Sequence, residues 1–176
     1  MNAQVTCTID GISPLLMHAY PLVPIEALEK KTPEEQAEYA AYRDPDGRLY
    51  VPGVNVQRCL VNAGKFSKGK GRASLERTVA ACVIVLDERI VLPQQQYVID
   101  TRSVVIPATK GRILRHRPRF DSWSLSFSIR YDPDLLSAEQ IRRVVDDAGQ
   151  RVGLLDFRPE HKGMFGRFQV TSWVTA

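Results

Sequence analysis

Hydrophobic and polar residues alternate most regularly between residues 122 and 131, where every second side chain is apolar and those between are four serines and an arginine. Successive side chains of a strand point to opposite faces. The pattern therefore predicts a strand in an antiparallel sheet that has one buried and one polar face. The same alternation over 3–10 predicts a first strand, and the short apolar segment 168–174 predicts a last one.

An amphipathic helix is predicted over residues 137–152, because its apolar residues recur at helical spacing on one face. Ser137 followed by Gln140 matches a capping box at its start. Gly153 suits its end, because glycine readily takes the left-handed conformation that closes many helices.

A second helix is expected over 54–66, capped by Asn55 or Gly53, with apolar positions that suit packing on a sheet. The apolar, β-branched stretch 78–91 reads as two strands joined by a turn at 87–88. Two further strand pieces are expected near residues 94–106, around Asp100.

Residues 18–48 are rich in proline and acidic residues and look like an insertion. Within it, Thr32 and Glu35 have the capping-box spacing at the start of a helix over 33–42.

With the insertions set aside, the order of elements is β-α-β-β-α-β. This order predicts the α+β, ferredoxin-like (RRM-like) fold, an antiparallel sheet with helices on one face. The length of 176 residues fits a single domain, 1–176, that carries the acidic insertion 18–48, a basic hairpin over 101–120 and a Gly-rich loop over 153–167.

The net charge is only +4, from 24 Lys and Arg against 20 Asp and Glu, but the charges are clustered. One basic cluster follows the second helix, and another falls in the hairpin without an intervening acidic residue. Local clusters of this kind favour an anionic partner more than the total charge does. Their members are Lys65, Lys68, Lys70, Arg72 and Arg77 in the first, and Lys110, Arg112, Arg115, Arg117 and Arg119 in the second.

The loop between the last helix and the last strand contains three glycines, Gly153, Gly163 and Gly166, among cationic residues. Glycine permits positive φ and lets another molecule approach the backbone closely. The loop is either a nucleic-acid-binding element or a long turn in which Arg158 and Arg167 pair with neighbouring acids.

Metal and membrane sites are not expected. The three cysteines form no CxxC pair, and the three histidines lack metal-ligand spacing, so we expect reduced thiols, no metal and no cofactor. No apolar run is long enough to span a membrane, and the N-terminus lacks a signal-peptide pattern, so a cytoplasmic protein is expected.

Three segments carry a resemblance to a known superfamily: the glycine loop 153–167 before the last strand, the Pro-Gly step within 50–60, and the segment from Thr101 to Phe120. On these the chain resembles the RAMP superfamily of CRISPR-associated RNA-binding proteins. Over nearly its whole length it is similar to a phage and prophage family of uncharacterised RAMP-like proteins. It departs from the RAMP pattern at Leu154-Leu155, where a Gly-x-Gly opening is expected.

The resemblance implies that the glycine loop contacts RNA, that the hairpin wedges into a guide strand, and that copies of the chain line up along it. It also implies a phage or prophage protein in a bacterial host cell. With the charge clusters, it predicts sequence-independent binding of single-stranded RNA or DNA, RNA preferred, as a homo-oligomer or ribonucleoprotein subunit. The predicted contact residues are Arg112, Arg115, His116, Arg117, Arg119, Arg158, Lys162, Arg167, Lys65, Lys68 and Lys70.

Other functions stay open at this point. His116 could act as general base on a ribose 2′-hydroxyl in a metal-independent endoribonuclease, because imidazole titrates near neutral pH. It could equally add a hydrogen bond to phosphate. A phage protein that mimics a CRISPR subunit and interferes with the host complex is the other alternative. The basic segments could also be a solvated hairpin tip and simple loops.

Overall fold

The main sheet has four antiparallel strands, one of which is the regularly alternating segment of the sequence. This computed structural model describes residues 3–69, 71, 73–106 and 109–175. The first strand, β1 (Ala3–Gly11), lies between β8 (Ser124–Tyr131) and β9 (Phe168–Thr175). The strand order is β4 (Val83–Val85), β8, β1 and β9.

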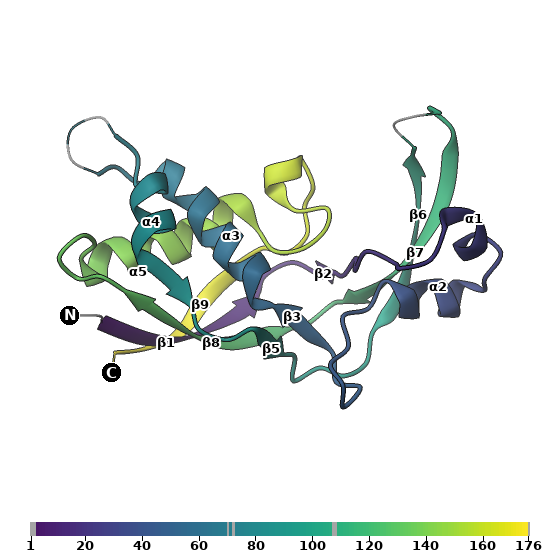
Figure 1. Ribbon diagram of the computed structural model, residues 1–176, viewed down its shortest axis with the longest axis horizontal. Coiled ribbons are helices and arrows are strands. Elements are labelled where there is room, and N and C mark those ends of the chain that lie inside the picture. Colours follow the sequence, from purple (N-terminus) through teal and green to yellow (C-terminus); the bar gives the residue numbers. More distant parts are fainter. Residues whose placement is uncertain (1–2, 70, 72, 107–108, 176) are drawn as a thin grey trace.

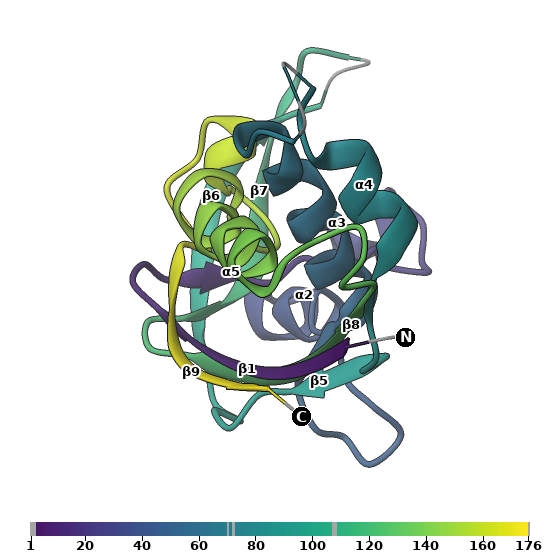
Figure 2. The same cartoon turned by 90° about the vertical axis from the view of Figure 1, so that its left-hand side faces the viewer.

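Three helices cover one face of this sheet (Figure 2). They are α3 (Gly53–Ala63), α4 (Glu76–Cys82) and α5 (Ala138–Asp147). The order β1-α3-β4-β8-α5-β9, with the fourth strand beside the first and the third beside the second, is that of two interlocked split βαβ units. The predicted α+β, ferredoxin-like class is confirmed.

The core lies between the sheet and the helices. Val5 opposes Ile129 and Cys7 opposes Phe127, and all four are buried. The intervening residues form the outer face, where the Thr8 hydroxyl donates a 3.2 Å hydrogen bond to the Ser126 hydroxyl. The alternation seen in the sequence is therefore the division between core and solvent.

The capping signals were read correctly. Ser137 forms a capping box with Gln140 at the start of α5, which continues through a π-helical turn, η2 (Ala148–Val152). The chain then leaves at Gly153, where φ is 77°. Thr32 and Glu35 form the same motif at the start of α2 (Pro33–Tyr39).

Two predictions of local structure were wrong. Residues 76–82 form α4 rather than a strand, because Leu75 and Val79, four residues apart, are both buried in the core. Only the short β4 and β5 (Arg89–Val91) of that stretch are strands. Neither Asn55 nor Gly53 caps α3, since Pro52 takes the N-cap position and both residues lie inside the helix.

A second group of elements lies to one side of the sheet (Figure 1). A long hairpin of β6 (Val98–Val105) and β7 (Arg112–Phe120) projects there, extended by the short β2 (Leu15–Leu16). Helix α2 lies against β7, and α1 (Ile25–Leu28) is nearby. β3 (Tyr50–Pro52) pairs with β5 in a separate two-stranded sheet. The short η1 (Gly64–Phe66) follows α3, and η3 (Pro159–His161) lies in the glycine loop.

The part of the chain that the structure describes contains neither a membrane-spanning helix nor a cluster of metal ligands. None of its helices is long and apolar enough to cross a membrane. Its His, Cys, Asp and Glu side chains form no group of three or more that could hold a metal ion.

Gly53, the first residue of α3, lies against the backbone that precedes β5, so a substitution there tests this packing. Its amide donates a 2.8 Å hydrogen bond to the Glu88 carbonyl, and a Cβ there would lie 1.8 Å from the Asp87 carbonyl oxygen. Gly53→Ala should lower the free energy of unfolding by about 1–3 kcal/mol, measured by urea denaturation. Gly111→Ala, exposed in the hairpin turn, should change it by less than about 0.5 kcal/mol. Equal effects would contradict this account.

Candidate functional site

The hairpin and the glycine loop, far apart in sequence, meet through an ion pair. The guanidinium of Arg117 on β7 donates to the carboxylate of Asp156 in the loop. Arg117 is only 5% exposed. The Asp156 amide in turn donates a 3.0 Å hydrogen bond to the Leu16 carbonyl of β2. Two of the segments predicted to bind nucleic acid therefore form one joined surface.

Arg102 strengthens the same junction. It projects from β6 over the rings of Phe157 and Phe165 of the glycine loop, with centroid distances of 5.3 and 4.9 Å. Asp100 accepts hydrogen bonds of 2.7 and 3.0 Å from its guanidinium. A cation over an aromatic face is attracted by the ring quadrupole, so Arg102 holds the loop against the base of the hairpin.

The loop backbone takes positive φ at three non-glycine residues, Leu155, Phe157 and Lys162. Leu155 has φ of 59° and Phe157 has φ of 52°. Bulky residues rarely take this conformation, and such strain persists only where the surroundings enforce it. Here Arg158 donates a 2.8 Å hydrogen bond to the Leu155 carbonyl, and the Phe165 amide donates a 3.0 Å hydrogen bond to the Phe157 carbonyl. Leu155 thus takes a glycine-like backbone near the start of the loop.

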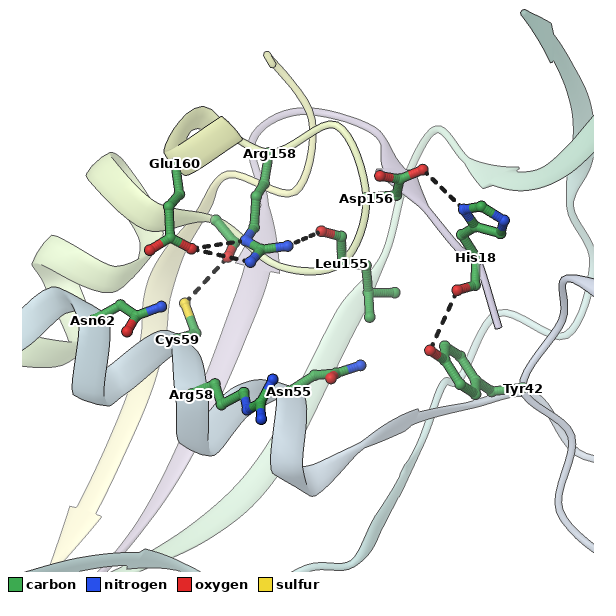
Figure 3. Close-up of a pocket in the computed structure, with 11 residues that line it drawn as sticks. His18, Tyr42, Asn55, Arg58, Cys59, Asn62, Leu155, Asp156, Arg158 and Glu160 are labelled. Atoms are coloured by element: carbon green, nitrogen blue, oxygen red, sulfur yellow. Dashed lines mark hydrogen bonds and ion pairs between the residues drawn. The ribbon is translucent and has the colours of Figure 1, made fainter. Parts of the chain in front are cut away.

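A pocket of about 240 Å³ opens between the glycine loop and α3 (Figure 3). Polar side chains form most of its wall. They come from α3, from the loop, and from the two ends of the insertion. The lining residues are His18, Tyr42, Asn55, Arg58, Cys59, Asn62, Gly153, Leu155, Asp156, Arg158 and Glu160.

Helix α3 contributes a polar stripe to the pocket. Asn55, Arg58 and Asn62 follow at intervals of three and four residues, so they share one face of the helix. Val56 and Leu60 are buried on the side that meets the core. The stripe is visible in the sequence, but only the fold shows that it faces the loop.

The carboxylates of the pocket are held ionised by their neighbours. Burial alone would raise the pKa of Asp156, but hydrogen bonding to His18, 3.3 Å away, and the charge of Arg117 lower it to about 2. Burial also opposes ionisation of Glu160, and Arg158, Lys65 and Asn62 outweigh it and lower its pKa.

Burial keeps two other groups of the wall, the Tyr42 phenol and the Cys59 thiol, uncharged at physiological pH. Burial raises the pKa of the Tyr42 phenol, whose hydroxyl donates a 3.4 Å hydrogen bond to the His18 carbonyl. Burial also raises the pKa of the Cys59 thiol, which donates to the Gly153 carbonyl at 3.2 Å. The pocket therefore combines fixed anions, uncharged hydrogen-bonding groups and the cation Arg58.

Several predicted contact residues are already engaged within the chain. Arg119 pairs with Asp121 at 2.8 Å and with Asp100 at 3.5 Å. Other side chains pair within or beside the glycine loop. These are Arg117 with Asp156, Arg158 with Glu160 at 3.0 Å, Lys65 with Glu160 at 3.5 Å, and Arg167 with the Gln150 carbonyl.

Other predicted residues have no acidic partner among the residues described. Arg112, Lys162 and Lys68 are exposed, and Arg115 is half-buried. His116 lies on β7 with its Nδ1 2.8 Å from the Thr101 hydroxyl. Lys70 and Arg72 lie outside the described residues.

The two faces of the hairpin differ. Side chains alternate along β7, so Arg115 shares the face of Arg117, which is turned toward the glycine loop by its pair with Asp156. Arg115 also opposes Arg102 across the hairpin. Arg112 and His116 lie on the other face. Arg115 therefore lies on the hairpin face turned toward the loop, and it lines a small hollow there with His18 and Gln36 of the insertion. It has no acidic partner among the described residues.

The sequence analysis missed part of the site. The helical stripe Asn55, Arg58 and Asn62 was a usable signal, because it places polar groups on a helix expected to lie on a sheet. His18 and Tyr42 gave no such signal, since their positions depend on the path of the insertion.

No protein-family model matches the sequence, and no curated protein matches it. Among solved structures, the chain is similar to one chain of the Type III-B Cmr-β complex bound to cognate target RNA, determined by cryo-EM. The TM-score is 0.56 at 10% sequence identity. The likeness is one of fold. It covers 99% of this chain and 60% of that chain, so the protein spans about three fifths of its neighbour.

The Arg117–Asp156 pair predicts a stability that depends on pH. Because the pKa of Asp156 is lowered from 3.8 to about 2, its contribution is complete above about pH 4 and is lost as pH falls toward 2. Asp156→Asn should lower the free energy of unfolding at pH 7 by about 1–3 kcal/mol, because it leaves the Arg117 guanidinium without its counter-charge. The variant should also lose less stability than the wild type between pH 4 and pH 2.

Chemical denaturation at several pH values measures both effects. Asp121→Asn is the control, since its pair with Arg119 is more exposed and should contribute less than about 1 kcal/mol. A parallel pH dependence in wild type and Asp156→Asn would contradict the role given to this pair.

Proposed function

We propose that this protein binds single-stranded nucleic acid, RNA in preference to DNA, mainly through the phosphate backbone. The strand lies in the space between the hairpin and the glycine loop and passes the mouth of the pocket beside α3. Arg115 and Lys162 contact phosphates, with Arg58 at the pocket. Arg102, Arg117 and Arg158 have a different task, which is to hold the surfaces in place.

The observation that carries this proposal is the unpaired Arg115 on the hairpin face turned toward the loop. Arg117 and Arg119, on the same face, already have carboxylate partners, and Arg115 has no acidic partner in the described parts of the chain. A cation placed on a structured surface without a counter-charge favours an anionic ligand.

The loop also offers apolar surface to bases. Phe157 is 38% exposed and Met164 is 62% exposed, beside the exposed Lys162. Single strands are bound without sequence preference by cations that follow the backbone and by flat or soft side chains that contact bases. This arrangement supports a single strand over a duplex.

The fold likeness is compatible with the same function. The similar solved chain belongs to a complex that is bound to target RNA. At 10% identity this likeness carries the fold alone, so the assignment of RNA to this protein rests on its own charges and on the RAMP resemblance of its sequence.

Removing Arg115 gives the direct test. Arg115→Ala should weaken binding of a labelled single-stranded RNA, measured by fluorescence anisotropy across a salt series. The slope of log affinity against log salt should become shallower by about 0.7 if one phosphate contact is lost. Unlabelled DNA of the same sequence should compete less well than RNA.

Arg112→Ala is the matched control, because it removes the same charge from the opposite face of the same strand. It should reduce affinity less and leave the slope nearly unchanged. Equal losses in both variants would mean that the hairpin acts only through its overall charge. The absence of RNA binding by the wild type at low salt would overturn the proposed function.

We also propose that several copies assemble along one strand. The exposed acidic residues of the insertion, Glu26, Glu29 and Glu34, are opposite in charge to the hairpin tip and the loop of a neighbouring copy. Light scattering after size exclusion should give a mass that rises in steps with RNA length. A monomer at every RNA length would contradict assembly without affecting strand binding.

A further inference from the structure

The pocket beside α3 has the chemistry of a binding site that a phosphate backbone alone does not need. A phosphate backbone is bound by cations and by hydrogen-bond donors, and it leaves carboxylates and the acceptor oxygens of amides unused. Here Asn55, Asn62 and Glu160 line a concave site (Figure 3). The site also contains the cation Arg58, which has no acidic partner in the part of the chain that the structure describes. The occupant should therefore present hydrogen-bonding groups as well as negative charge.

The volume of the pocket limits the size of the ligand that it can hold. Its volume of about 240 Å³ is well above the roughly 30 Å³ of one water in the liquid. It is just below the range of roughly 300–1,000 Å³ that is usual for drug-sized ligands. A ring system the size of a nucleobase suits this volume, and a simple anion would leave most of it empty.

The hydrogen-bonding inventory suits a base edge. Each asparagine amide offers a donor and an acceptor side by side, and Glu160 adds an ionised acceptor whose pKa is lowered by Arg158, Lys65 and Asn62 against the effect of burial. The Tyr42 ring provides a flat wall. Bases unstacked from a single strand are typically held by such pairs of ring and polar edge.

The walls are fixed before a ligand arrives. On the loop side, Arg158 holds the strained backbone of Leu155, and Arg102 packs on the nearby Phe157. Strain of this kind gathers at ligand clamps. On the other side, α3 packs on the core through Val56 and Leu60. A preformed pocket loses little conformational entropy when it is filled.

We propose that this pocket binds one nucleotide, with its base against Tyr42, Asn55 and Asn62 and its phosphate on Arg58. Under the proposed function the nucleotide is one residue of the bound RNA strand, splayed out beside the loop. Only the origin of the nucleotide in an RNA strand rests on the proposed function. A free nucleotide would present the same base and phosphate to the pocket.

Nitrogen-15 NMR of the full chain tests the pocket directly. The side-chain amide signals of Asn55 and Asn62, assigned from alanine variants, are followed during titration with each of the four ribonucleoside monophosphates. Ribose 5-phosphate and inorganic phosphate serve as probes that lack a base. At least one monophosphate should shift both amide signals and bind at least tenfold more tightly than ribose 5-phosphate.

Two variants at one position separate hydrogen bonding from shape. Asn62→Ala and the similarly sized Asn62→Leu should each weaken the preferred monophosphate at least tenfold while leaving the phosphate titration unchanged. Val54→Ala, on an exposed face of α3 outside the pocket, should change neither. Equal affinity for ribose 5-phosphate and the monophosphates, or no shift of either amide with any probe, would overturn the nucleotide site.

The oligonucleotide assay keeps this inference apart from the proposed function. If RNA binds but the monophosphates do not shift the amides, the pocket proposal fails and strand binding stands. If the monophosphates bind in the pocket but no RNA binds at low salt, strand binding fails and the pocket is a site for a free nucleotide. If both bind, Asn62→Ala should preserve the salt slope of RNA and lose discrimination against an abasic oligomer.

Discussion

A guanidinium stays charged in proteins, so one that is almost fully buried requires a fixed anion beside it. Arg117 and Asp156 satisfy this requirement across 39 residues of sequence. The pair sets the position of the hairpin relative to the glycine loop. Once that position is set, Arg102 lies over two loop aromatics and the strained turns at Leu155 and Phe157 are enforced. The pocket is a consequence of the same arrangement, because Asp156 and Leu155 form part of its wall.

The parts of the fold that could be predicted are those whose signal is local. Strand β8 alternates over its whole length because one face is core and the other is solvent, and the capping boxes of α2 and α5 involve neighbours three residues apart. Helix α4 was misread because its β-branched residues suit a strand, while the burial of Leu75 and Val79 against distant elements favours a helix. Tertiary packing outweighed local propensity there.

Charge clusters in the sequence predicted a binding region but could not assign roles to individual residues. Three arginines of β7 illustrate this point. Arg117 holds the loop, Arg119 holds neighbouring carboxylates, and Arg115 is left without an acidic partner in the described residues. Their spacing is alike in the sequence, and the difference arises only from where acidic residues lie after folding. The pocket was missed for a related reason, since it joins residues 18, 42, 55–62 and 153–160.

The chain passes between the main sheet and the hairpin region at residues 12–18, 43–49, 92–97 and 121–123. Motion about a hinge is easiest where few connections cross it. With several crossings reinforced by the Arg117–Asp156 ion pair, we expect little hinge motion between the main sheet and the hairpin region. A molecule that contacts both parts would therefore meet two surfaces whose relative position is set before it arrives, which keeps the conformational entropy cost to the protein small.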